Sequence, residues 1–330
     1  MAKLASAVLG SFAAVILAAI AARLFGRRGV AIGVGIAAAL DPSLVMVSSD
    51  VQSEPLFLVL LLGAGFLLLA SVERPSSTLS LVAGILTGLA ILTRPSALAV
   101  APLLAAPLVD RRWPFRARAH LAAAGILGAV LSLAPWTIRN AVVYREFVLV
   151  SDVGGFNFYL GNSDLMARFY EIRDRKSYDA WSDETFRLLG DRLNELNSAG
   201  LTSPGRITKA LTRRTLAEAA ARPAATIRLL AHKAADWLRP YPNPLFWPGS
   251  VVLGIGALYA LLYVLAARGL LLAPRRGATV FALAFLIASM AAHVLTLVSW
   301  RYRVPYWDPV LILFGVFGAG TLLPGWKLSN

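Results

Sequence analysis

Charged side chains recur where the apolar runs of this chain end. Asp50 and Glu54 stand four residues apart in S-S-D-V-Q-S-E-P, Arg301 and Arg303 stand two apart in W-R-Y-R-V-P, and Arg94 precedes a proline. A carboxylate can take the proton of an attacking hydroxyl group. The planar fork of an arginine donates two parallel hydrogen bonds to a phosphate. The pattern predicts a site that binds an anionic phosphate, through the arginines, and activates a hydroxyl acceptor, through Glu54 and Asp50.

A further polar group lies between Ala134 and Asn162, where an apolar run gives way to a polar segment. Pro135 and Trp136 predict the end of a long helix there, because proline disrupts a helix interior. Arg139 follows at the point where that helix should meet water, and we expect it to join the phosphate-binding arginines. A short strand is predicted at residues 148–150, directly after this group.

The glycine-rich run G-G-F-N-F-Y-L-G-N supplies the candidates for acceptor binding. Its glycines predict turns with backbone angles that other residues avoid; they are Gly154, Gly155 and Gly161. The side chains expected to contact the acceptor are Asn157, Tyr159 and Asn162. The spacing G-x-G-x-x-G is absent, so the run does not predict a dinucleotide site.

Each of these groups also has a simpler explanation. Asp50 and Glu54 fit the solvated start of a helix, where carboxylates interact favourably with the helix dipole. The arginines that neighbour Trp136 and Trp300 fit residues anchored at a membrane interface. Arg94 and its proline fit a helix-breaking turn, and the glycine-rich run fits a pair of strands without a ligand. Only the expected placement of the groups on one side of a membrane favours a common site.

The elements that must position these residues are membrane helices. The chain has 330 residues, of which 58% are hydrophobic and 15% charged, and this is too apolar for a soluble domain. The net charge of +14 does not indicate nucleic-acid binding, because much of the arginine excess lies in short loops between apolar runs. The chain has no cysteine and only three isolated histidines, and we predict neither a metal nor a cofactor.

The hydrophobic runs predict an all-α polytopic membrane protein with about nine transmembrane helices. The runs are residues 4–24, 30–48, 56–72, 79–92, 96–109, 121–134, 251–267, 280–298 and 310–323. The pair Asp41-Pro42 predicts a break inside the second run. Each acidic residue outside the polar segment falls near the end of an apolar run.

Twelve of the eighteen acidic residues lie between Glu146 and Asp236. Residues 140–246 are therefore expected to form a mainly helical domain between two membrane parts, 1–139 and 247–330. Helices are predicted at 183–196 and 204–221, with Ser182 and Ser203 as N-terminal caps.

Arginine clusters place the loops at 23–28, 110–118 and 268–276 in the cytoplasm. Alternation of the spans then puts the candidate residues, and the extracytoplasmic domain 140–246, on the outer face of an inner or plasma membrane. The same count puts Met1 outside without a span before it, so a preceding helix is expected to be missing.

Four motifs together resemble the GT-C glycosyltransferases that use polyprenyl-phosphate sugars, the group that contains protein O-mannosyltransferases and the aminoarabinose transferase of lipid A. The motifs occupy Ser53–Leu62, Gly84–Ser96, Pro135–Asn162 and Arg301–Pro309. The resemblance implies a GT-C-like bundle and an inverting attack on the sugar by an acceptor hydroxyl group. The implied partners are the lipid-linked sugar, an acceptor protein, lipid or glycan, and membrane lipids.

Within this resemblance, Glu54 matches the family's acidic residue at the outer end of an early helix. Arg301 and Arg303 match its basic loop near the donor phosphate. The family's main catalytic aspartate, in its first outer loop, has no counterpart, because the first run here resembles the family's second helix and Asp50 comes too late. A displaced start, a fragment and a degenerate relative without transferase activity all fit this departure.

Two alternatives come from other classes. One is a non-catalytic transporter of lipid or polysaccharide, and the other is a partner-dependent membrane subunit. A transporter should show inverted repeats or charged residues near the middle of the membrane. The sequence shows no repeats, and its charges lie at the ends of the apolar runs, which favours the transferase.

Overall fold

The computed structural model describes residues 1–151, 153–274, 276–324 and 326, and these residues form helices without a strand. The chain divides into two compact units. The first comprises Met1–Pro135, Ala257–Ser289 and Arg301–Asn330, and the second comprises Trp136–Gly256 and Met290–Trp300. The predicted all-α class is confirmed. Arg275, in one of the basic loops used for orientation, lies outside the described residues.

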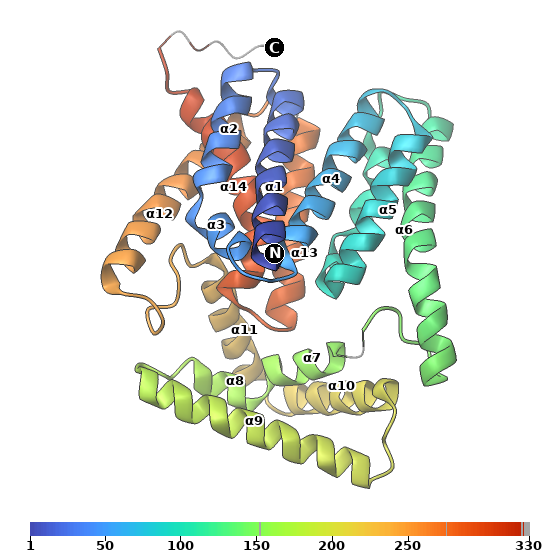
Figure 1. Cartoon of the computed structure of the whole chain (residues 1–330), viewed down its shortest axis with the longest axis vertical. Coiled ribbons are helices and arrows are strands. Elements are labelled where there is room, and N and C mark those ends of the chain that lie inside the picture. Colours follow the sequence, from blue (N-terminus) through green and yellow to red (C-terminus); the bar gives the residue numbers. More distant parts are fainter. Residues whose placement is uncertain (152, 275, 325, 327–330) are drawn as a thin grey trace. The chain divides into compact units, whose positions relative to one another are not determined.

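The first unit is built from long apolar helices (Figure 1). Its elements are α1 (Ala2–Phe25), α2 (Arg28–Leu40), α3 (Pro42–Ser48), α4 (Glu54–Glu73), α5 (Ser77–Thr93), the 3-10 helices η1 (Pro95–Ala99) and η2 (Ala101–Val109), and most of α6 (Phe115–Tyr144), α12 (Gly249–Leu272), α13 (Arg276–Leu295) and α14 (Trp300–Gly320).

Five of the described helices are long and apolar enough to cross a membrane, namely α1, α4, α6, α12 and α13. Helices α2 and α3 make a sixth span if they are taken together, with a bend of 55° between them. This bend confirms the break predicted at Asp41-Pro42. The remaining three predicted runs correspond to α5, the pair η1 and η2, and α14, which are shorter or carry charges. The chain is therefore a multi-pass membrane protein.

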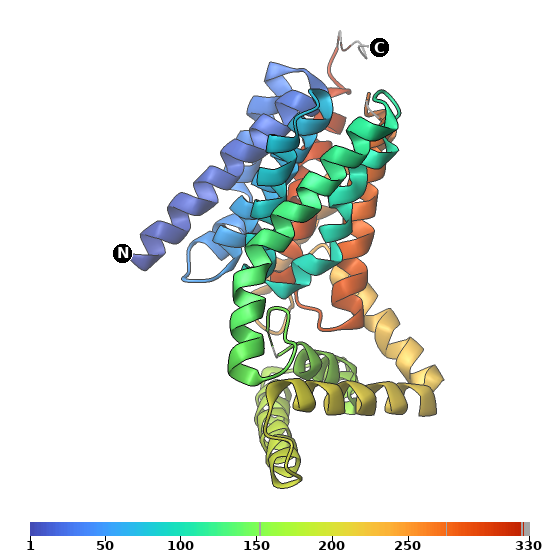
Figure 2. The same ribbon diagram turned by 90° about the vertical axis from the view of Figure 1, so that its right-hand side faces the viewer.

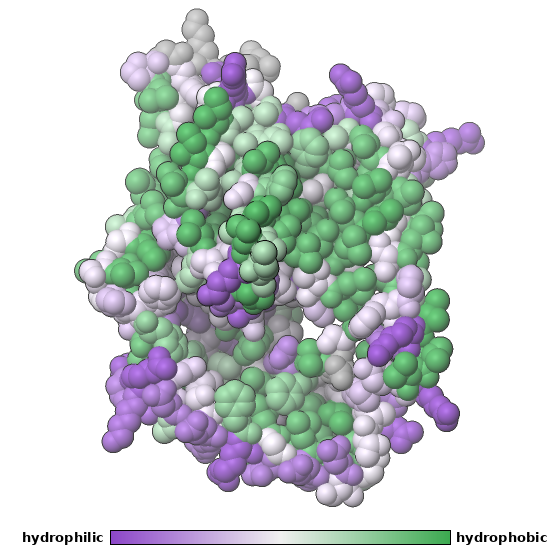
Figure 3. All heavy atoms as spheres, in the orientation of Figure 1, coloured by the Kyte–Doolittle hydropathy of each residue, from purple (hydrophilic) through white to green (hydrophobic). Residues whose placement is uncertain are grey.

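The surface of these helices is consistent with contact to lipid. Large apolar side chains stay exposed along them, for example Val15, Val264 and Leu271. Figure 3 shows the apolar residues covering the helices of the first unit over a wide area. A contiguous apolar surface of this extent is unfavourable in water and favourable in a bilayer.

Helices α5 and α6 pack closely because glycines line their contact. A Cβ atom added to Gly84 would lie 1.8 Å from the carbonyl oxygen of Gly125, and one added to Gly128 would lie 2.1 Å from that of Leu81. The two helices run side by side in both views (Figure 2). Small residues allow such close approach between membrane helices, which explains the glycines of the G-I-L-T-G segment by packing.

The expected end of α6 at Pro135 and Trp136 is wrong. The helix continues through the proline to Tyr144. Proline removes one backbone hydrogen bond, but the next turns regain contacts through Trp136 and Thr137, whose side chains donate to the carbonyl oxygens of Val150 and Leu149.

The second unit is helical as predicted for most of residues 140–246. Its helices are α7 (Gly154–Asn162), α8 (Asp164–Phe169), α9 (Arg175–Ser198), α10 (Pro204–Ala221) and α11 (Pro223–Leu238). Ser203 caps α10 by accepting the N–H of Arg206, as expected. Ser182 lies inside α9 instead, because Asp174 starts this helix earlier by accepting the N–H of Ser177.

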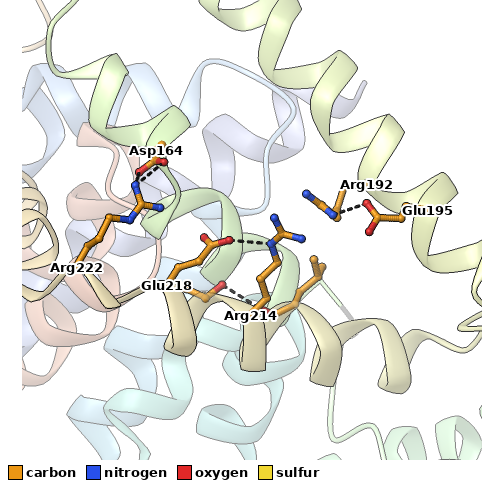
Figure 4. A network of polar contacts seen from close by, with 8 residues as sticks. Asp164, Arg192, Glu195, Arg214, Glu218 and Arg222 are labelled. Carbon is orange, nitrogen blue, oxygen red and sulfur yellow. Dashed lines mark hydrogen bonds and ion pairs between the residues drawn. The ribbon is translucent and has the colours of Figure 1, made fainter. Parts of the chain in front are cut away.

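Ion pairs connect exposed and half-buried side chains of the second unit (Figure 4). Arg222 lies 2.8 Å from Asp164, and Arg214 lies 2.8 Å from Glu218 on the same helix. The residues of the first pair are more than half exposed. Exposed pairs contribute on the order of 0.2–1 kcal/mol each, so they add little to the stability of this unit.

Candidate functional site

A buried carboxylate between two arginines forms the candidate site of the first unit. Glu54 is 0% exposed. Its Oε1 atom lies 2.6 Å from Nη1 of Arg94 and accepts a hydrogen bond from Nε of Arg301. Its Oε2 atom accepts a second hydrogen bond from Nη2 of Arg301 at 3.0 Å. The fork of Arg301 therefore binds both oxygens of the carboxylate, the geometry expected of a strong pair.

Three elements far apart in the sequence bring these residues together. Glu54 begins α4, where Pro55 favours the first turn. Arg94 ends α5, because Pro95 follows it and holds the residue before it extended. Arg301 lies in the first turn of α14. Glu54 is thus no solvated helix start, and Arg94 does more than terminate a helix.

The site carries more positive than negative charge. Two guanidinium groups face one carboxylate, so the three side chains sum to +1 when all are ionised. The side chain of Arg94 is 12% exposed and that of Arg301 is 43% exposed. Arg94 also lies 4.9 Å from the ring centre of Tyr302. Arg301 is therefore the more accessible of the two arginines, and Arg94 is the more buried one.

Asp50 interacts electrostatically with Arg301 but is not one of the paired carboxylates of this group. It is exposed, and its carboxylate accepts the backbone N–H of Val51 at 2.8 Å and the amide of Gln52 at 3.4 Å. The segment between Asp50 and α4 leaves this carboxylate open to solvent. Among the residues that the structure describes, no group of three or more His, Cys, Asp or Glu is placed to hold a metal ion.

Arg303 does not join Arg301, although only one residue separates them. It is 0% exposed, and its Nε atom lies 3.3 Å from Oδ1 of Asp308. The expected basic turn at 300–305 is in fact the start of α14. Two residues along a helix rotate a side chain by roughly 200°, so the two arginines point to opposite sides.

Arg139 belongs to the second unit and pairs with aromatic rings. Its guanidinium carbon lies 5.2 Å from the ring centre of Trp136 and 5.8 Å from that of Tyr144. It also donates to Oδ1 of Asn140 at 3.1 Å. Contacts of this kind favour a planar cation that is held in place.

Asn140 explains why residues 148–150 form no strand. Its buried amide donates to the carbonyl oxygens of Val148 at 3.1 Å and Val150 at 3.2 Å. A side chain therefore satisfies these carbonyl groups in place of a neighbouring strand, and the chain bends at Leu149 and Val150.

The glycine-rich run is the helix α7, so the predicted turns are wrong. None of its glycines has a positive φ. A Cβ atom on Gly155 would lie 2.7 Å from Thr208, and one on Gly161 would lie 1.7 Å from the carbonyl oxygen of Thr296. These glycines permit close packing, and Asn157 and Tyr159 lie half-buried on the helix between them.

Asn162 is held by a buried lysine that the sequence did not single out. Lys233 is 0% exposed, and its ammonium group donates to the carbonyl oxygens of Gly161 and Thr296, both at 2.9 Å, and to Oδ1 of Asn162 at 3.1 Å. Burial lowers the pKa of Lys233 to about 8. The amide of Asn162 donates to the carbonyl oxygens of Phe158 and Leu295. All three ammonium donors have acceptors, so Lys233 has a structural role: it connects α11 to the end of α7 and to the backbone at Thr296.

Three other residues of a buried cluster also escaped the sequence analysis, namely Asp41, Tyr259 and Asp308. The hydroxyl oxygen of Tyr259 lies 2.9 Å from one oxygen of each carboxylate. Asp308 lies inside α14, two residues before the apolar run at 310–323. Its position five residues after Arg303 was the sequence feature that could have indicated a pair between these two residues.

Comparison with known proteins gives one match. Residues 1–138 match the family model described as dolichyl-phosphate-mannose-protein mannosyltransferase. This segment includes Glu54 and Arg94. No curated protein and no solved structure matches the chain. The family match agrees with the resemblance predicted from the sequence, over the N-terminal part of the chain.

Proposed function

We propose that this protein is a membrane glycosyltransferase that moves a sugar from a polyprenyl-phosphate donor to an acceptor hydroxyl group at the outer face of a cell membrane. The observation that carries the proposal is the buried pairing of Glu54 with Arg94 and Arg301. The family match of the N-terminal part supports it independently.

The charge of the site suits such a donor. A sugar linked to a lipid through one phosphate is a phosphodiester with a single negative charge. Arg94, Arg301 and Glu54 sum to +1, so the bound donor neutralises the site. Arg301 is 43% exposed and has guanidinium edges that do not face Glu54. We place the phosphate on Arg301, with Arg303 excluded because it is buried and paired elsewhere.

We assign Glu54 the role of positioning the arginines. Arg94 and Arg301 already occupy Oε1, and Arg301 also occupies Oε2. A carboxylate that is filled in this way has little capacity to take a proton from an acceptor. Asp50, which is exposed on the same segment, is the carboxylate that we propose for this proton. Arg139, Asn157 and Tyr159 stay candidates for substrate contact, while Asn162 supports α7.

The proposed reaction is a single displacement at the anomeric carbon of the sugar. The acceptor oxygen forms a bond to the anomeric carbon while the bond from that carbon to the phosphate oxygen breaks. The hydroxyl proton passes to a carboxylate, and the configuration at the anomeric carbon inverts. Negative charge grows on the departing polyprenyl phosphate, and the guanidinium group of Arg301 stabilises it where it develops.

The test is sugar transfer by the full chain in membranes, from a radiolabelled polyprenyl-phosphate sugar. Arg301→Ala and Glu54→Gln should lose transfer while folded protein persists. Arg112→Ala is the control, because Arg112 forms an exposed pair with Asp110 in another loop. Full transfer by both site variants would remove this site from the reaction. Movement of labelled lipid across the membrane without a glycosylated product would favour a transporter.

A further inference from the structure

A second set of polar side chains, here called the buried acid cluster, lies inside the first unit. Its members are Asp41, Ser43, Tyr259, Arg303 and Asp308, and each is at most 5% exposed. They come from the junction of α2 and α3, from α12 and from α14. Ionisable groups inside a membrane bundle are costly and generally serve a function. The proposed transfer reaction uses none of them.

The hydroxyl group of Tyr259 contacts three of the other members of this cluster. Its oxygen lies 2.6 Å from Oγ of Ser43, 2.9 Å from Oδ2 and 3.0 Å from Oδ1 of Asp41, and 2.9 Å from Oδ2 of Asp308, so it contacts three side chains. A phenol has one proton to donate and otherwise accepts. It can therefore donate in one of these contacts and must accept in the other two. Ser43 can supply one proton, so the remaining contact requires a proton from a carboxyl group.

We propose that Asp308 is a carboxylic acid that donates its proton to Tyr259, and that the cluster is a proton-binding site. Asp41 is the partner that stays ionised. Its Oδ1 atom accepts the backbone N–H groups of Ser43 at 3.0 Å and Leu44 at 2.9 Å, which favours the charged form.

The net charge supports the same assignment. The guanidinium group of Arg303 lies over the ring of Tyr259 at 5.2 Å, with its Nε atom 3.3 Å from Asp308. If both carboxyl groups were ionised, the cluster would carry a buried charge of −1. With one proton bound, Arg303 and Asp41 balance, and the buried site is neutral. A neutral cluster avoids the large cost of an uncompensated charge in a low-dielectric interior.

The cluster also fixes the end of α14 that carries the candidate site. Arg303 lies about half a turn and Asp308 about two turns after Arg301 on this helix. They tie the helix to α12 and to the α2–α3 junction. Asp308 is therefore a positioning residue for Arg301. This last step rests on the proposed function, whereas the proton site does not.

The test is infrared spectroscopy of the purified full chain at neutral pH, in a detergent without ester groups. The wild type should show the carbonyl stretch of a buried carboxylic acid. Asp308→Asn should abolish this band. Asp41→Asn should abolish it as well, because Asp308 then ionises to balance Arg303. Asp50→Asn should leave it unchanged as the exposed control. Tyr259→Phe should shift it upward, because a weaker hydrogen bond stiffens the carbonyl group.

Absence of the band from the wild type would overturn the proton site without the need for any variant. Retention of the band in Asp308→Asn would overturn the assignment to Asp308. Thermal unfolding gives a second reading: Asp308→Asn keeps a donor to Tyr259 and should unfold at a higher temperature than Asp41→Asn. The reverse order would contradict the proposal. None of these readings depends on sugar transfer.

Discussion

Nη1 of Arg94 lies 2.6 Å from Oε1 of Glu54, at the point where the end of α5 meets the start of α4. Glu54 is fully buried, so its charge is tolerated only because Arg94 and Arg301 neutralise it. Glu54 thus binds Arg94 of α5 and also holds Arg301 of α14, the more exposed of the two arginines.

This relationship predicts strong coupling between Glu54 and Arg94. Glu54→Ala leaves two guanidinium groups without their carboxylate and should destabilise the protein by about 3–5 kcal/mol, whereas Arg94→Ala leaves Glu54 paired with Arg301 and should destabilise it less. The double variant should recover part of this loss, with a coupling of about 1–3 kcal/mol. A double-mutant cycle on thermal unfolding of the detergent-solubilised chain measures it. Additive losses would show that the two side chains do not interact.

Asn140 should hold the segment that follows α6. Asn140→Asp keeps the shape of the side chain but removes both donated hydrogen bonds, and a buried carbonyl oxygen without a partner costs about 1–3 kcal/mol. The segment should open more often, and the backbone at Arg145, whose side chain is already exposed, should then fit the active site of trypsin more readily. We expect faster cleavage after Arg145 than in the wild type. Asn197→Asp, on the exposed side of α9, is the control, and an equal rate in both variants would refute this role of Asn140.

Lys233 should make the stability of the second unit depend on pH. Its pKa is about 8 in the folded chain against about 10.5 when solvated, so the unfolded chain binds more protons between these values. Stability attributable to this group is therefore fully present above about pH 10.5 and is lost as pH falls towards 8. The full change is about 3 kcal/mol.

The measurement for Lys233 is denaturant unfolding of the wild type and of Lys233→Met at pH 7.5 and pH 10. The difference in unfolding free energy between the two proteins should shift in favour of the wild type as pH rises. A difference that stays constant over this range would contradict the depressed pKa. The comparison cancels the titration of other groups that the two proteins share.

The glycine contact between α5 and α6 should not tolerate a side chain. Gly128→Ala places a Cβ atom 2.1 Å from the carbonyl oxygen of Leu81, so the helices must separate. We expect a loss of several degrees in unfolding temperature. Gly65→Ala is the control, because no atom lies within 4 Å of a Cβ at that position. Equal unfolding temperatures for the two variants would show that the helices do not pack in this way.

The sequence predicts those features that depend on local chemistry. Asp41-Pro42 breaks a span because a proline follows an N-cap residue, and Ser203 begins α10 because its hydroxyl group accepts a backbone N–H. The burial of Arg303 was not predictable in this way. It depends on where α14 begins, and that start is fixed by partners from α2, α3 and α12.

Gly155 and Gly161 show the same limit. Glycine favours turns in isolation, yet here it permits contact with Thr208 and with the backbone at Thr296. Those neighbours are distant in sequence, so no local pattern reveals them. The pairing of Glu54 with Arg94 and Arg301 was predictable in part. The residue types indicated an anion site, whereas only the fold shows that the carboxylate is buried between both arginines.

The proposed binding of the donor phosphate by Arg301 is tested most directly by the affinity of the purified full chain, in nanodiscs, for a polyprenyl monophosphate. Wild-type protein should bind it saturably, and Arg301→Ala should weaken binding about tenfold or more, since a hydrogen bond to a charged group contributes about 1.5–3 kcal/mol. Arg112→Ala should bind like the wild type. Equal affinity of the wild type and Arg301→Ala would contradict the assignment of the phosphate site.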